Sequence, residues 1–196
     1  MTQYKSVPFQ SLPVGATYSR PVFERPKGLT ADSPAVEAMT DLRRVTALTV
    51  ERTNTLSATR ERMKKLGVRM LLVTGATGAV MGIITITDLE SGRAETIASK
   101  TGEEPSMLQV QDVMTLDGHI EVITLDAIEK AKVGDILSSF DETGRRHALV
   151  LCSETDRGHD EICGIFSLTV TCELIGLSVE PGDPMDKIKA QLRTIL

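Results

Sequence analysis

The sequence predicts an α/β protein of the α+β type, in which two copies of one structural unit follow an extended N-terminal arm. Strand and helix patterns recur in the same order in residues 44–102 and 103–179. Prolines and aromatic residues are concentrated in residues 1–43, and a short tail, residues 180–196, ends the chain. A chain of 196 residues is long enough for one domain, or for two small ones that share a core.

The arm, residues 1–43, contains five of the eight prolines and four of the six aromatic residues. Proline fixes φ and disfavours helix for the residue before it, so we expect an extended segment with little helix of its own. Its aromatic residues, Tyr4, Phe9, Tyr18 and Phe23, are expected to pack on the body of the same chain. The alternative is an arm that is exchanged in a dimer.

The first copy, residues 44–102, has the order strand, helix, strand, strand, helix. Residues 45–50 alternate in polarity, apolar residues in 56–66 recur at helical spacing, and Gly67 is a typical helix stop. Residues 70–73 and 80–86 form two apolar strands joined by a glycine-rich turn. A further helix is predicted to begin at Asp88.

The second copy, residues 103–179, repeats this order. Strands are predicted at 122–125, 148–151 and 163–168, and helices at 133–140 and 171–177. Gly144 lies 77 residues after Gly67, and Gly164 lies 82 residues after Gly82, so the second hairpin has the longer loop. One copy is too small to bury its own apolar faces, and the two sheets are therefore expected to pack against one another.

Composition excludes several classes of function. The chain has 22 basic and 27 acidic residues, a net charge of −5, which argues against a general binder of nucleic acid or anionic membranes. No stretch approaches the roughly 20 apolar residues of a membrane span, and no secretory signal is visible. Cys152, Cys163 and Cys172 form no CxxC pair and predict buried thiols in a reducing, cytoplasmic setting.

The most informative motif is residues 82–88, Gly-Ile-Ile-Thr-Ile-Thr-Asp. A hydroxyl, Thr85, ends a strand, and a carboxylate, Asp88, follows at a helix start, a place where a sugar or phosphate can bind. A carboxylate can accept hydrogen bonds from a ribose diol, and a threonine hydroxyl can donate to a phosphate. Alternatively, Asp88 caps the helix by accepting from the amide of Glu90 or Ser91. The two roles are compatible.

With its second copy, this motif resembles a cystathionine-β-synthase-type (CBS) domain pair, also called a Bateman module, over about residues 44–179. The resemblance implies two pseudo-symmetric sheets packed between helices. It also implies an adenosine-containing ligand, such as AMP, ADP, ATP or S-adenosylmethionine, in the cleft between the copies. By resemblance, Thr85 and Asp88 hold ribose or phosphate and Ile83 lines the adenine slot.

The second copy departs from the motif, because Ser167 keeps the hydroxyl but Val170 replaces the carboxylate. Its pocket is therefore expected to be weak or unused. The family often places a basic residue where this chain has Arg146 and His147, and Arg69 is the equivalent in the first copy. These residues are candidates for binding phosphate, for which an arginine fork is well suited. The alternative for Arg145 and Arg146 is a favourable interaction with the preceding helix C-terminus.

Other motifs predict no chemistry. Residues 72–78 resemble the nucleotide-binding turn of short-chain dehydrogenases, but a strand follows where that fold needs a helix. The polar loop 153–161 contains His159 among carboxylates and is expected to be a solvated hairpin loop rather than a metal site. The tail is expected to be a linker and a short amphipathic helix that docks on the body or on a partner.

These features together predict a non-catalytic sensor that needs no cofactor, binds an adenosine ligand and changes the state of an unidentified protein partner. The alternative is a structural homodimerisation module with degenerate pockets. We expect a homodimer, because an apolar face left open on a monomer is uncommon. The candidate faces are Leu56, Met63 and Ile97, and Val133, Leu137, Leu174 and Ile175.

Overall fold

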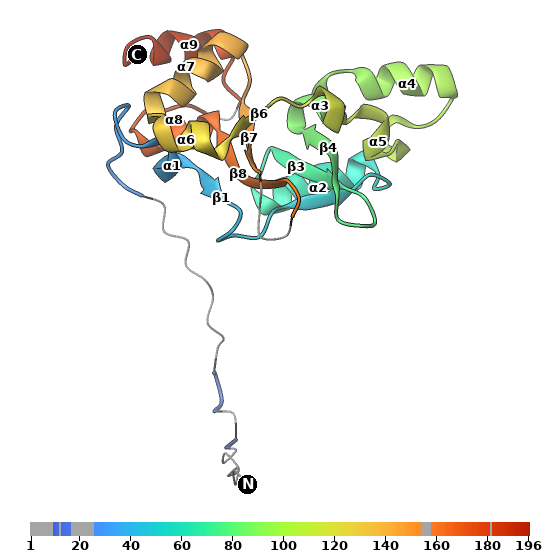
Figure 1. Cartoon of the computed structure of the whole chain (residues 1–196). Helices are drawn as coiled ribbons and strands as arrows, with labels where there is room; N and C mark the ends of the chain where they lie inside the picture. The colour runs from blue at the N-terminus through green and yellow to red at the C-terminus, as the bar shows by residue number, and fades with distance from the viewer. Residues whose placement is uncertain (1–9, 12, 17–25, 154–157, 181) are drawn as a thin grey trace.

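The computed structural model describes residues 10, 11, 13–16, 26–153, 158–180 and 182–196. It contains two four-stranded sheets with helices packed around them, which confirms the predicted α+β class and the tandem repeat. The two halves lie side by side in Figure 1. Among the described residues, no helix has the length and apolar character needed to cross a bilayer.

The first sheet has the strand order β2-β3-β4-β5. Parallel pairing joins β2 to β3, and the other pairs are antiparallel. Its elements are β2 (Thr49–Glu51), α2 (Leu56–Leu66), β3 (Met70–Thr74), β4 (Val80–Thr85), α3 (Ile86–Glu90), α4 (Arg93–Thr101), the 3₁₀ turn η1 (Pro105–Met107), α5 (Val110–Val113) and β5 (Thr115–Leu116).

The second sheet has the order β1-β8-β7-β6, again with one parallel pair, β6 with β7. Its elements are α1 (Ala35–Ala38), β1 (Thr40–Asp41), the 3₁₀ turn η2 (Asp117–His119), β6 (Val122–Thr124), α6 (Leu125–Lys130), α7 (Val133–Thr143), β7 (His147–Cys152), β8 (Glu161–Ser167), α8 (Leu168–Leu174) and α9 (Met185–Leu192).

Each sheet is completed by a two-residue strand that lies far from its partner copy in the sequence. β1, which precedes the first copy, joins the second sheet, and β5, which precedes β6, joins the first sheet. Thr40–Asp41 pairs with β8, and Thr115–Leu116 pairs with β4. Figure 1 shows β1, in blue, among the orange and red elements of the second half. Gly82 permits this approach in the first sheet, because a Cβ there would collide with the carbonyl oxygen of Thr115. The segment before β6 therefore covers the edge of the first sheet.

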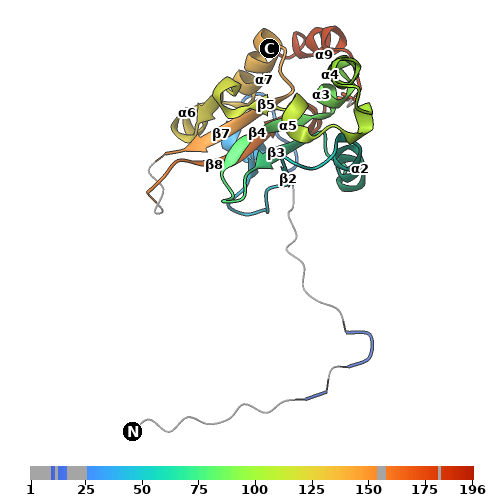
Figure 2. The same ribbon diagram turned by 90° about the vertical axis from the view of Figure 1, so that its right-hand side faces the viewer.

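The sheets contribute to a shared apolar layer. Met70 and Leu72 of β3 and Leu149 of β7 are buried together, with partly buried residues from both sheets around them. The outward-facing side of each sheet is covered by the helices of its own half, as Figure 2 shows from the side. This arrangement confirms that the two sheets pack against one another, and it places the ends of β3 and β7 beside a common cleft.

The helix stops predicted at equivalent places in the two copies are confirmed. Gly67 ends α2 with φ 67°, and Gly144 ends α7 with φ 69°, a left-handed conformation that glycine adopts without strain. Each helix leads within a few residues to the central strand of its sheet. The chain therefore enters β3 and β7 by the same path.

The C-terminal part of the arm packs on its own chain. The amide of Ala35 donates to the carbonyl of Ala131 (2.9 Å), and Ala35 is fully buried. The predicted extended arm thus contains a one-turn helix, α1, because its last residues serve as a cover for the second half. The aromatic residues Tyr4, Phe9, Tyr18 and Phe23 lie outside the described residues.

The tail also docks on the same chain. Ile188 and Leu192, on one face of α9, are completely buried in the core of the second half. In Figure 1 the red helix α9 lies against α7. The apolar face of this helix therefore packs on the body of its own chain and not on a partner.

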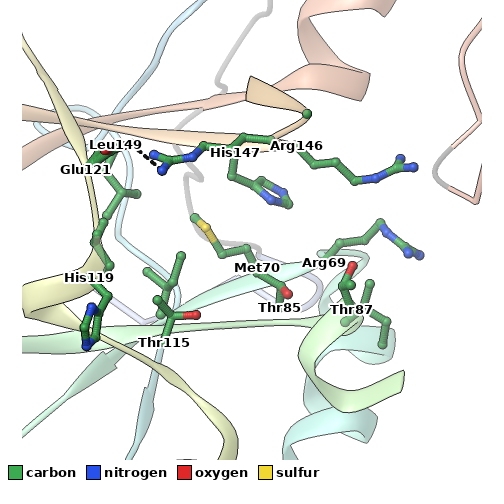
Figure 3. Close-up of a pocket in the computed structure, with 15 residues that line it drawn as sticks. Arg69, Met70, Thr85, Thr87, Thr115, His119, Glu121, Arg146, His147 and Leu149 are labelled. Carbon is green, nitrogen blue, oxygen red and sulfur yellow. Dashed lines mark ion pairs between the residues drawn. The ribbon is translucent and has the colours of Figure 1, made fainter. Parts of the chain in front are cut away.

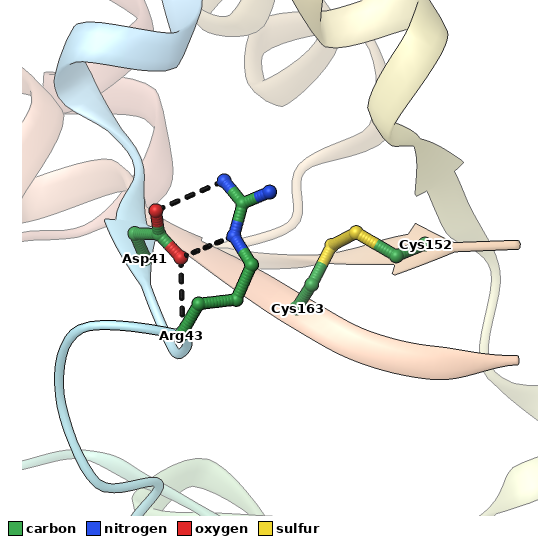
Figure 4. The surroundings of a disulfide bond; sticks show 4 residues. All are labelled: Asp41, Arg43, Cys152 and Cys163. Carbon is green, nitrogen blue, oxygen red and sulfur yellow. Dashed lines mark hydrogen bonds and ion pairs between the residues drawn. A yellow bond between two sulfur atoms is a disulfide. The ribbon is translucent and has the colours of Figure 1, made fainter. Parts of the chain in front are cut away.

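Cys152 and Cys163 form a disulfide between β7 and β8, so the prediction that both are thiols is wrong (Figure 4). The strand register shifts between Val150 and Leu151, and Cys163 is the residue left out of the pairing. This bulge brings it beside Cys152. Only Cys172 is a free thiol, and it is buried, which raises its pKa to about 11.

The exposed faces proposed from the sequence need a second correction, since most of their residues point inward. Helical periodicity identifies an apolar face but does not say whether the chain's own sheet already covers it. The buried residues are Leu56, Met63, Val133 and Leu137, and the partly buried ones are Ile97, Leu174 and Ile175.

Candidate functional site

A cavity of about 340 Å³ lies between the two copies, where β3 and β7 begin and β4 ends (Figure 3). Four of the five site residues expected from the sequence line it: Ile83, Thr85, Arg146 and His147. The fifth, Asp88, is not among the lining residues. The cleft therefore brings together the hydroxyl of the first copy and the basic residues of the second.

The basic residues reach the cleft through a strand-to-helix junction that has the same backbone in both copies. The amide of Ile86 donates to the carbonyl of Arg69, and the amide of Leu168 donates to the carbonyl of Arg146, both at 2.9 Å. Each arginine thus stands directly before a central strand and beside the first residue of a helix. Arg69 and Arg146 both line the cavity.

Thr85 and Asp88 form a capping box at the start of α3. The Thr85 amide and hydroxyl both donate to Oδ2 of Asp88, at 2.8 and 2.7 Å, and the Asp88 amide donates to the Thr85 hydroxyl at 3.2 Å. Thr85 is therefore the N-cap and Asp88 the third helical residue. The alternative in which Asp88 accepts from Glu90 or Ser91 is wrong, because the helix begins two residues earlier than predicted.

The equivalent junction of the second copy lacks this box. Ser167 precedes α8, which begins at Leu168 rather than at the predicted Thr171, and its side chain makes no capping hydrogen bond. Val170 stands where the first copy has Asp88 and offers no acceptor. The two strand-to-helix turns therefore share a backbone path, but only the first has the side-chain capping hydrogen bonds.

The cleft has a concentration of positive charge. One terminal nitrogen of Arg146, Nη2, donates to the backbone carbonyl of Asp183. The other, Nη1, is buried and has no hydrogen-bond partner among the described residues. Burial, and then the charges of Arg69 and Arg146, lower the pKa of His147 to about 4. This buried guanidinium nitrogen therefore retains hydrogen-bonding capacity that the described residues do not use.

One rim of the cleft is closed by an ion pair between Arg145 and Glu121. Figure 3 draws this pair beside His119 and Thr115, which also line the cavity. Arg145 therefore binds a carboxylate of the segment between the copies, rather than only the C-terminus of α7 as the sequence suggested. Sequence reasoning missed Thr115, His119 and Glu121, because they reach the cleft only through the exchange of β5.

His159 lies in the polar loop that precedes β8. Among the described residues, no group of three or more histidine, cysteine, aspartate or glutamate side chains could hold an ion. His159 instead makes an ion pair of 3.3 Å with Glu161 on β8. Residues 154–157 of the loop lie outside the described residues.

The two sheets, the exchanged strands and the cleft between the copies define the fold of a CBS-domain pair. A CBS-domain containing protein from Agrobacterium tumefaciens matches with a TM-score of 0.52 and 16% identity, over 78% of this chain and 98% of its own. An uncharacterized conserved protein from Pyrococcus horikoshii matches at 0.52 and 20%, over 79% and 100%. A protein with CBS domains from Burkholderia ambifaria matches at 0.50 and 18%, over 70% and 89%.

The sequence identities to these three structures are low, so the matches show a shared fold and no more. No protein-family model matches the chain, and no curated protein matches it. The chain therefore has the tandem CBS-domain fold, and its function must be argued from its own residues.

Proposed function

We propose that this protein is a non-catalytic regulatory module that binds an adenosine nucleotide in the cleft between its two copies. The observation that carries the proposal is the buried Nη1 of Arg146, which has no hydrogen-bond partner among the described residues and belongs to a cavity that Arg69 and His147 also line. A phosphate oxygen would supply the acceptor that this nitrogen lacks. Arginine binds phosphate through several parallel hydrogen bonds, so the site has the chemistry for an anionic ligand.

The rest of the cleft suits the nucleoside. A volume of about 340 Å³ is at the small end of the range for ligand pockets, roughly 300–1,000 Å³. Ile83 and Met70 provide apolar surface for a base, and Thr85 lies beside them. Asp88 lies outside the cavity lining and accepts from the Thr85 hydroxyl through Oδ2. Its carboxylate would accept from a ribose hydroxyl if the ligand extends to the start of α3.

We expect one nucleotide per chain, because only the junction at Thr85 and Asp88 has both a hydroxyl and a carboxylate. The ligand would contact both copies, and its binding would therefore change how firmly they are held together. We propose that a homodimer transmits this change to a protein partner. Light scattering at micromolar concentrations tests the dimer, and a monomer mass throughout would contradict it.

Titration calorimetry of the full chain with AMP, ADP, ATP and S-adenosylmethionine tests the proposal. Removal of one charged phosphate contact in Arg69→Ala should weaken nucleotide binding by about 1.5–3 kcal/mol, or about ten- to a hundredfold. Arg193→Ala is the matched control, because Arg193 lies beyond α9 and its side chain is 70% exposed. Absence of binding by a stable dimer would favour the structural dimerisation module instead.

A further inference from the structure

His147 occupies a special position in the cleft. It is the first residue of β7 and pairs with Ser167, so its backbone is fixed in the middle of the second sheet. Its ring points into the cavity above Met70 and lies beside Arg146 (Figure 3). The imidazole is thus a potential ligand contact on a rigid strand.

The charged groups that face His147 come from every element around the cavity. Arg146 directly precedes its own strand, and Arg69 directly precedes β3. The segment before β6 contributes Glu121, which is paired with Arg145, and His119. The only carboxylate that lines the cavity is therefore already neutralised by an arginine.

This environment keeps the imidazole neutral at pH 7. Burial is the larger cause of its low pKa, about 4, and the two guanidinium groups add to it. A bound phosphate would offset the effect of the two arginines and raise the pKa of His147, because its two negative charges would lie among Arg69, Arg146 and His147. The phosphate would also supply an acceptor for the hydrogen bond that a protonated ring nitrogen donates.

We infer that binding of a phosphate-bearing nucleotide in this cleft is coupled to the uptake of one proton by His147, so that affinity rises as the pH falls. The proton comes from the solvent and stays on a ring nitrogen of His147, which then donates a hydrogen bond to a phosphate oxygen. This inference rests on the proposed function and specifies its regulation. It also favours AMP, ADP and ATP over S-adenosylmethionine, whose sulfonium adds positive charge beside two arginines.

Calorimetry of AMP binding near pH 7, in buffers of different ionisation enthalpy, measures this proton directly. The full chain should take up a fraction of a proton per AMP, and the control His159→Gln should take up the same fraction. His147→Gln should take up none, and adenosine should cause no uptake in any of the three. The second pKa of a phosphate is about 6, so the ligand itself would release protons rather than take them up.

The pH dependence provides a second readout. Between pH values just above the His147 pKa of the free protein, about 4, and the raised pKa of the complex, the AMP dissociation constant should rise with pH by up to about tenfold per pH unit relative to His147→Gln. NMR titration of the His147 ring in the unmodified protein should show its pKa rise to near neutral pH when AMP is bound. This measurement needs no variant that must fold.

The possible results separate the proton coupling, the preference for phosphate and the proposed function from one another. Binding of AMP with equal proton uptake by the full chain and His147→Gln, or an unchanged His147 titration, would overturn the coupling while leaving the proposed function intact. Equal affinity for S-adenosylmethionine and AMP would overturn the preference for phosphate. Failure of AMP, ADP and ATP alike to bind would overturn both the proposed function and the coupling.

Discussion

The ends of β4 and β8 are two versions of the same turn with different chemistry. In both, a hydroxyl residue ends the strand, and the first helical amide donates back to an arginine carbonyl. In the first, Asp88 completes a capping box with Thr85, whereas in the second Val170 leaves Ser167 without a side-chain cap. The backbone of a duplicated fold can thus persist while the polar contacts that make a binding site remain in one copy only.

The glycines of the two copies give the largest contrast in stability. Gly82→Ala should destabilise the protein by roughly 2–4 kcal/mol, because the new Cβ would meet the backbone of Thr115, which cannot move without breaking the β4–β5 pairing. Gly164→Ala meets only the flexible side chain of Met39 and should cost about 1 kcal/mol. Urea unfolding of both variants measures the difference, and equal losses would contradict this account of strand exchange.

The pH dependence of stability without ligand is the next largest effect. A histidine with a pKa of about 4 in the folded protein and 6.5 when unfolded contributes stability that is fully present above pH 6.5 and is lost as the pH falls toward 4. His147→Gln should therefore lose about 2 kcal/mol less than the unmodified chain between pH 6.5 and pH 5. Urea unfolding curves at the two pH values test this, with His159→Gln as the control. Parallel losses in all three proteins would show that His147 titrates normally.

Asp88→Ala removes the carboxylate that the second copy already lacks. Two hydrogen bonds to Oδ2 are lost, so stability should fall by about 1–2 kcal/mol, and AMP affinity by about ten- to a hundredfold. Thermal unfolding and calorimetry on the same sample separate the two effects. A loss of stability with unchanged affinity would mean that Asp88 is only a capping residue.

The smallest effect is expected from the opposite exchange, Val170→Asp. It would place a carboxylate at the third position of α8, where it could accept from the Ser167 amide and interact with the helix dipole. Stability should rise by about 0.5 kcal/mol, as measured by thermal unfolding. A loss of stability would mean that the backbones of the two turns are less alike than their hydrogen bonds indicate.

The regular parts of this fold were predictable from the sequence. The helical spacing before Gly67 and Gly144 marked α2 and α7, and the apolar runs marked the paired strands of both sheets. The motif at residues 82–88 identified Thr85, the resemblance to a CBS-domain pair identified Arg146, and both line the same cleft. These features are local, so a pattern of a few residues carries them.

The exchanged strands and the disulfide were not predictable, because both depend on distant geometry. β1 and β5 have two residues each, which is too short for any alternation in polarity. The pairing of Cys152 with Cys163 depends on a one-residue bulge that moves the second cysteine out of register. Likewise, the contact of Glu121 with Arg145 follows only once β5 has crossed to the first sheet.

A crystal structure of the full chain grown with AMP would test the central claim most directly, namely that one of the two junctions is a nucleotide site and the other is not. We predict one AMP per chain, with its phosphate on Arg69 and Arg146 and its ribose near Asp88. A nucleotide at Ser167 and Val170, or one at each junction, would contradict the account.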